Sequence, residues 1–146
     1  MRNKGMRLAA ALLLLSSLAV PSAYTSAAAK SVKAKVKVKV TLVSMELTEN
    51  NHVGNEWYTA GYINDKEIKE GSSVVLDLKA TESIKLKGYV EEQDKIPDKG
   101  ETVSTIKVSE LSKPVTKAVK VTVTENRGRY SGNTATWKFT FKVQKQ

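Results

Sequence analysis

The sequence contains no cysteine and only one histidine in 146 residues. Without cysteine no disulfide can form, so a domain that is exported from the cell must be held together by packing alone. The histidine, His52, lies in the Asn- and Gly-rich turn "ENNHVGN", and one imidazole without any thiolate is too few ligands for a zinc site. No serine lies in a nucleophile-elbow context, and a catalytic triad also needs a base that a third group orients. These absences predict that the protein is not an enzyme.

Aromatic residues are also scarce, at 6% of the chain. The lysine-rich segments have few aromatic side chains between them, whereas a surface that stacks single-stranded nucleic acid needs both. We therefore expect no nucleic-acid partner. The acids cluster in predicted loops and not in facing pairs, which argues against hydrolysis by two carboxylates across a cleft. No segment shows an apolar period of 3.6 over a helical length, so a helical core is not predicted.

The first 29 residues have the layout of a secretory signal peptide. Three basic residues precede an apolar run at 8–20, and small residues follow it. These small residues match the pattern of a signal-peptide cleavage site after Ala28 or after Ala29. The apolar run is shorter than the ~20 residues of a membrane-spanning helix. We expect residues 1–29 to be a signal peptide and residues 30–146 to form one secreted domain of a bacterial protein.

Alternation of apolar and polar residues dominates the remaining chain. In "SVKAKVKVKVTLV" the lysines occupy the odd-numbered positions 33–39, and apolar residues occupy the even-numbered positions 32–42, which places the two sets on opposite faces of a strand. In "TATWKFTFKV" the residues Trp137, Phe139 and Phe141 likewise share one face. Turn-forming residues separate the strands, which is typical of an all-β fold: an antiparallel two-sheet β-sandwich of about seven to eight strands. Besides the segment 31–43, the predicted strands are 56–63, 73–80, 83–91, 102–109, 116–125 and 134–143.

The basic character of the chain is concentrated in one row of lysines. The formal net charge is +9, and residues 1–29 contain three basic residues and no acid, so the mature domain keeps a positive excess. Alternate positions of the first strand carry Lys33, Lys35, Lys37 and Lys39. Two interpretations are open: lysines on an edge strand that prevent strand-to-strand aggregation, or a face that binds anionic surfaces such as lipid headgroups or cell-wall polymers.

Acidic residues gather in one segment, "YVEEQDKIPDKGETV". Glu91, Glu92, Asp94 and Asp98 fall within eight residues, next to Pro97 and before a glycine. Proline, aspartate and glycine are good turn formers, so the segment fits a solvated turn. Clustered carboxylates also fit a cation site, because calcium takes six to eight oxygen ligands.

Two segments together resemble the ligand loops of a C2 domain, the calcium- and phospholipid-binding β-sandwich. "VTLVSMELTENNHVGNEWYTAGYI" resembles the first loop and "IKLKGYVEEQDKIPDKGETVSTIKVSEL" the third. The resemblance implies a calcium site, whose ligand positions match Glu49, Asn55, Glu92, Asp94 and Asp98. Two of the family's aspartates are glutamates here and a third is Asn55, and each change lowers the ligand charge or moves it outward. The resemblance therefore implies weak or lost calcium dependence.

Together these observations predict a secreted, non-enzymatic binding module that associates with an anionic membrane or cell-wall surface. The alternative is a secreted protein–protein interaction factor, such as an inhibitor or a toxin-associated protein, in which the acidic loops are structural.

Overall fold

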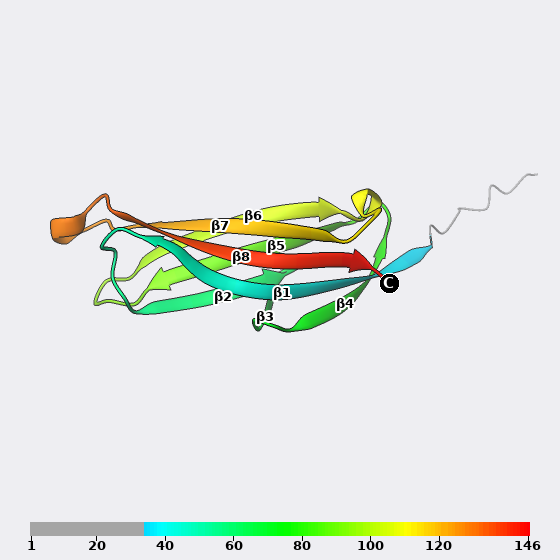
Figure 1. Ribbon diagram of the computed structural model, residues 1–146, viewed down its shortest axis with the longest axis horizontal. Coiled ribbons are helices and arrows are strands. Elements are labelled where there is room, and N and C mark those ends of the chain that lie inside the picture. The colour runs from blue at the N-terminus through cyan, green and yellow to red at the C-terminus, as the bar shows by residue number, and fades with distance from the viewer. Residues whose placement is uncertain (1–33) are drawn as a thin grey trace, which may run out of the picture. The chain divides into compact units, whose positions relative to one another are not determined.

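The computed structural model describes residues 34–146, which contain eight β-strands and two short 3-10 helices (Figure 1). The strands form two antiparallel four-stranded sheets, in the orders β4-β1-β8-β7 (sheet A) and β3-β2-β5-β6 (sheet B). The predicted all-β sandwich is therefore confirmed. The predicted signal peptide and Lys33 lie outside the described residues. The elements are β1 (Lys35–Asn50), β2 (Trp57–Ile63), β3 (Lys66–Ile68), β4 (Ser73–Lys79), β5 (Ser83–Glu92), β6 (Asp98–Lys107), η1 (Val108–Glu110), β7 (Val115–Thr124), η2 (Gly128–Tyr130) and β8 (Thr134–Lys145).

All seven predicted strands are present, with shifted ends. The first strand continues to Asn50, well beyond its alternating segment, and β6 begins at Asp98 and not at residue 102. Strand β3 was not predicted because it has only three residues, too few for a period to show. No helix in the described part of the chain is long and apolar enough to span a membrane.

Strand β1 is an interior strand of sheet A. It pairs with β4 on one side and with β8 on the other, and Val40 has Val74 and Val143 as its two partners. Its valines face the core, where Val38, Val40 and Leu42 have no exposed surface. The interpretation that its lysines protect a sheet edge is therefore wrong, because an edge strand has hydrogen-bonding partners on one side only.

The core lies between the two sheets and is built from the alternate residues of each strand that point inward. Phe139 and Phe141 of β8 are its largest fully buried side chains, and burying each is worth roughly 1.5–3 kcal/mol. Phe139 needs Gly88 of β5 on the facing sheet, since a Cβ at Gly88 would lie 2.6 Å from the Phe139 ring. Trp137, on the same face as the two phenylalanines, is only partly buried and packs against the core at its end.

The two long sides of the sandwich differ. On one side β6 approaches β7 so closely that a Cβ at Gly100 would overlap the carbonyl oxygen of Thr122. On the other side lie β3 and β4, where Val74, Leu76 and Leu78 remain partly exposed although they belong to the inward parity. The sandwich is therefore closed along β6 and β7 and more open along β3 and β4.

Candidate functional site

Three connections meet at one end of the sandwich, on the left in Figure 1. They are residues 51–56, 93–97 and 125–133, and we call this region the loop end. Backbone hydrogen bonds join the loops to each other and to the strands: the amide of Asn51 donates to the carbonyl of Thr134 at 2.9 Å, and the amide of Gln93 donates to the carbonyl of Glu56 at 2.7 Å. The two segments that resemble C2 ligand loops therefore lie side by side.

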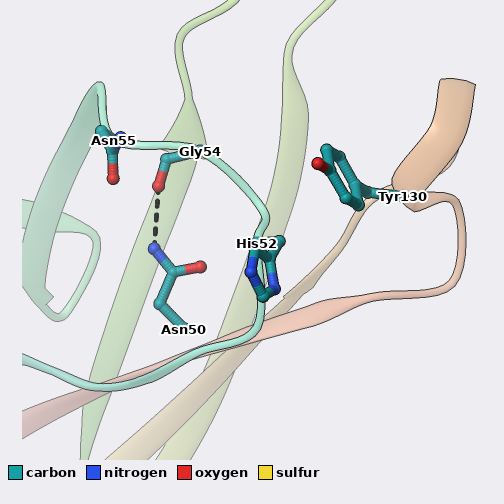
Figure 2. Close-up of a pocket in the computed structure, with 5 residues that line it drawn as sticks. All are labelled: Asn50, His52, Gly54, Asn55 and Tyr130. Atoms are coloured by element: carbon teal, nitrogen blue, oxygen red, sulfur yellow. Dashed lines mark hydrogen bonds between the residues drawn. The ribbon is translucent and has the colours of Figure 1, made fainter.

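A pocket of about 350 Å³ opens at the loop end, lined by Asn50, His52, Gly54, Asn55 and Tyr130 (Figure 2). Asn50 shapes the loop because its side chain bridges two backbone groups. Its Nδ2 donates to the carbonyl of Gly54 at 2.8 Å, and its Oδ1 accepts from the amide of Val53 at 3.0 Å. Val53, with 2% of its surface exposed, anchors the same loop in the core.

His52 occupies the left-handed region of backbone space, with φ of 57°. A residue with a Cβ pays a conformational cost there, which persists only where the surroundings determine the loop geometry. The imidazole stacks on the ring of Tyr130, with centroids 5.6 Å apart and planes inclined by 17°. Tyr130 belongs to η2, so this contact joins the first and the third loop across the mouth of the pocket (Figure 2).

Beneath the loops, two of the clustered acids are part of the strands and not of a turn. Glu92 ends β5, Asp98 begins β6, and the two residues are direct cross-strand partners. Their exposed fractions are only 5% and 7%. The interpretation of this segment as a wholly solvated turn is therefore wrong for these two residues. Asp98 accepts hydrogen bonds from Asn126, at 2.7 Å from Nδ2 and 3.3 Å from the backbone amide, and so ties β6 to the third loop.

Within residues 34–146, no side chain donates a hydrogen bond to Glu92 as Asn126 does to Asp98. Gly54 lies against the Glu92 carboxylate, and its φ of 123° is a conformation that favours glycine, so the first loop closes over Glu92 at a glycine. Within residues 34–146, the Glu92 Oε2 atom is buried without a hydrogen bond, as are the indole nitrogens of Trp57 and Trp137. The two indoles contact each other edge to face, with centroids 5.8 Å apart. The interior of the loop end thus contains one carboxylate oxygen and two indole N–H groups that the described residues do not satisfy.

Burial raises the pKa of Glu92 above its ordinary value, and the negative charges of Asp94, Glu125 and Asp98 raise it further. Glu91, the next residue, has the opposite shift. The hydroxyl of Tyr89 donates to Glu91 at 2.6 Å and, with Lys99 nearby, lowers the pKa of Glu91. The same hydrogen bond raises the pKa of Tyr89 to about 12. Neighbouring carboxylates on opposite faces of β5 therefore differ in their affinity for protons.

The five predicted calcium ligands are only partly assembled. Glu92 and Asp98 are paired, whereas Asp94 lies exposed in the turn between them and accepts a hydrogen bond from the amide of Ile96 at 2.6 Å. Glu49 lies exposed on β1, and Asn55 lines the pocket. In the described part of the chain, no three His, Cys, Asp or Glu side chains form a group that could hold a metal ion. Calcium binding stays a prediction.

A second candidate surface is the outer face of sheet A. Strand register places further lysines beside the predicted row, since Lys79 pairs with Lys35, Lys142 with Thr41 and Lys120 with Lys138. Sequence reasoning did not find this set because cross-strand partners cannot be read from one strand. We call it the lysine face; its members are Lys35, Lys37, Lys39, Lys79, Lys120, Lys138 and Lys142.

Ion pairs distinguish this face from the opposite side of the molecule. Within the described residues, two lysines of the lysine face have carboxylate partners: Lys37 with Asp77 at 3.0 Å and Lys138 with Glu46 at 2.8 Å. The other five have none. On the outer face of sheet B, three of the four lysines of β5 and β6 are paired, namely Lys85 with Asp65, Lys87 with Glu101 and Lys99 with Glu91, and only Lys107 has no carboxylate partner among the described residues. Among the described residues, the outer face of sheet A therefore presents more lysines without carboxylate partners than the outer face of sheet B.

No family model matches the chain, and no curated protein matches it. The resemblance to C2 domains accordingly stays an interpretation of the sequence.

We expect Glu92→Gln to change how stability depends on pH. Because the folded-state pKa of Glu92 is raised, its favourable contribution is present below the ordinary value of 4.5 and is lost as pH rises through the higher folded value. Glutamine avoids this loss, so the variant should gain stability relative to the wild type between pH 4.5 and pH 7. Chemical denaturation at several pH values measures the difference.

Glu91→Gln is the matched control, since the pKa of Glu91 is lowered in the folded state. Its stability relative to the wild type should fall as pH rises to the ordinary value of 4.5 and should then stay level up to pH 7, because the contribution of a carboxylate with a lowered pKa is complete above the unfolded value. A pH-independent difference for Glu92→Gln would contradict the burial of an ionisable carboxylate at the loop end.

Proposed function

We propose that this protein is a secreted, non-enzymatic binding module that associates with an anionic membrane or cell-wall surface through the lysine face. The observation that supports it is the set of lysines without carboxylate partners on sheet A: Lys35, Lys39, Lys79, Lys120 and Lys142. A four-stranded sheet presents them from neighbouring strands, about 4.8 Å apart, to one surface. Secretion rests on the signal-peptide pattern of residues 1–29.

The energetics of such a face are additive and sensitive to salt. A basic side chain near an anionic membrane contributes about 1 kcal/mol, and the attraction decays within a Debye length of about 8 Å at physiological ionic strength. Each lysine is therefore worth about fivefold in affinity, so several together give useful binding without any pocket. Phosphate groups supply the negative charge of both lipid headgroups and many wall polymers, so the same face suits either source.

A cation at the loop end is the second element of the proposal, following the resemblance to C2 domains. Glu92 is suited in part to bind a cation, because its Oε2 atom is buried without a hydrogen-bond partner among the described residues and Asp98 is its cross-strand partner. Two carboxylates supply fewer oxygens than the six to eight that calcium takes. Backbone carbonyls and water would have to complete the shell, and affinity would be weak.

A second candidate function, protein–protein interaction, is favoured by the open side of the sandwich. Strand β4, with seven residues, is an edge strand of sheet A. Beside it lies a groove of about 420 Å³. Its lining is apolar along β4 and at the end of β2, and polar at the turn into β3; the lining residues are Ile63, Asn64, Lys66, Glu67, Val74, Val75 and Leu76, of which Val75 is 50% exposed. An unpaired edge beside a groove with an apolar wall suits an extended segment of another protein that adds as a strand.

Replacing Lys35, Lys39 and Lys142 by glutamine should weaken binding to anionic surfaces by roughly a hundredfold, at about fivefold per lysine. The measurement is co-sedimentation with phosphatidylglycerol vesicles and, separately, with cell walls with and without their phosphate polymers. Raising the salt concentration should weaken wild-type binding in the same way.

The matched control replaces Lys85, Lys87 and Lys99 on sheet B, which removes the same charge from the opposite face and should have a smaller effect. Equal losses from both triple variants would mean that net charge, and not the lysine face, drives association. Salt-insensitive capture of a protein that Val75→Lys abolishes would favour the second candidate function instead.

Calcium should raise the Tm of the wild type by mass action, since the folded state binds it and the unfolded state does not. We expect a Kd on the order of 0.1–1 mM, as for weak extracellular sites. Glu92→Gln with Asp94→Asn should abolish the shift, and Glu101→Gln on the outer face of sheet B should retain it. Thermal melts with several millimolar calcium and with chelator measure this; an unchanged wild-type Tm would refute the cation site.

A further inference from the structure

Arginine is confined to one loop of the described chain. Residues 34–146 contain Arg127 and Arg129, whereas their other permanently cationic side chains are all lysines. Both arginines lie in the third loop of the loop end, on either side of Gly128, and both are exposed. Within the described residues neither side chain forms an ion pair or a hydrogen bond. Arginine differs from lysine in presenting a rigid fork that binds carboxylate or phosphate through two parallel hydrogen bonds.

Neither arginine lines the pocket itself, but one of them contacts an aromatic residue that does. The guanidinium carbon of Arg129 lies 5.9 Å from the ring centroid of Tyr130, and Tyr130 lines the pocket opposite His52 (Figure 2). Tyr130 has 46% of its surface exposed, so the ring is accessible to a ligand. A cation–π contact of this kind holds a guanidinium beside the ring while its N–H donors stay free.

The remaining lining is polar and uncharged. Asn50 is already used to brace the loop, but the amide of Asn55 and the hydroxyl of Tyr130 make no hydrogen bond within the described residues. The buried acids Glu92 and Asp98 do not line the pocket. Its volume of about 350 Å³ is in the range of small-ligand sites. The left-handed backbone of His52 shows that the loop holds its imidazole at a conformational cost.

We propose that this pocket binds a small polar ligand that bears an oxyanion, a carboxylate or a phosphate. The guanidinium of Arg129, with Arg127 beside it in the loop, binds the oxyanion; the Asn55 amide and the Tyr130 hydroxyl bind the polar groups next to it. The rings of His52 and Tyr130 pack against the body of the ligand. This site is separate from the lysine face, since it lies at the end of the sandwich and not on the outer surface of sheet A.

The test uses His52, the only histidine of the chain, whose imidazole signals are therefore unambiguous in a proton NMR spectrum. The probes are N-acetylmuramic acid, a sugar with a carboxylate; glycerol 3-phosphate; and N-acetylglucosamine, a neutral sugar, each titrated to about 10 mM in 150 mM salt, which screens non-specific attraction. We expect saturable shifts of His52 with at least one anionic probe and none with the neutral sugar. The two anionic probes distinguish a carboxylate from a phosphate ligand.

Arg127→Gln with Arg129→Gln should weaken the binding of the active probe at least tenfold. Lys39→Gln with Lys142→Gln removes the same charge from the lysine face and should leave the titration unchanged. Binding at the pocket and binding at the lysine face are therefore tested separately. The proposal is overturned if neither anionic probe shifts His52, if the neutral sugar shifts it equally, or if the two double variants bind alike.

Discussion

The pairing of β1 with a strand on each side is the constraint on which the rest of this structure depends. Hydrogen bonds to β4 and β8 fix the rotation of β1 about its own axis, so its two parities cannot exchange faces. The valines must enter the core, and the lysines must face outward beside those of β4 and β8. A slip of one residue would bury Lys39 and expose Val40, which explains why the register is strongly specified. Core and candidate binding face are thus two sides of one strand.

The loop end follows from how the strands finish. Glu92 and Asp98 are inward-pointing residues of β5 and β6, and both lie at the end of the apolar core. Asp98 is satisfied because Asn126 reaches it from the third loop, whereas Glu92 is covered by Gly54 and keeps an oxygen without a partner. The chain therefore places polar groups where apolar residues would serve stability better. Such local conflicts are typical of functional sites.

Most of the fold could be predicted from the sequence because each long strand carries its own period of two. Strand β1 was predicted to end early because its register shifts between Leu42 and Ser44 and between Leu47 and Glu49, which breaks the alternation. Whether its lysines protect an edge could not be read from the sequence, since an interior strand with one solvated face has the same alternation.

The candidate site was less accessible to sequence reasoning, because it depends on contacts between distant segments. The cluster of acids was visible, but the burial of Asp98 depends on Asn126, 28 residues away. The stacking of His52 on Tyr130 joins two loops whose sequences reveal only turns. The presence of Gly54 in the first loop, two residues after His52, gave one signal, since a glycine in a loop often marks a close approach of the backbone.

The most direct test of this account is amide hydrogen exchange along β1. Val38, Lys39, Val40 and Thr41 have partners on both β4 and β8, so all four consecutive amides should be protected to a degree similar to that of Phe139 in β8. If alternate amides of this segment exchanged as fast as those of a loop, β1 would be an edge strand. The lysine row would then protect an edge, and the continuous lysine face on sheet A would not exist.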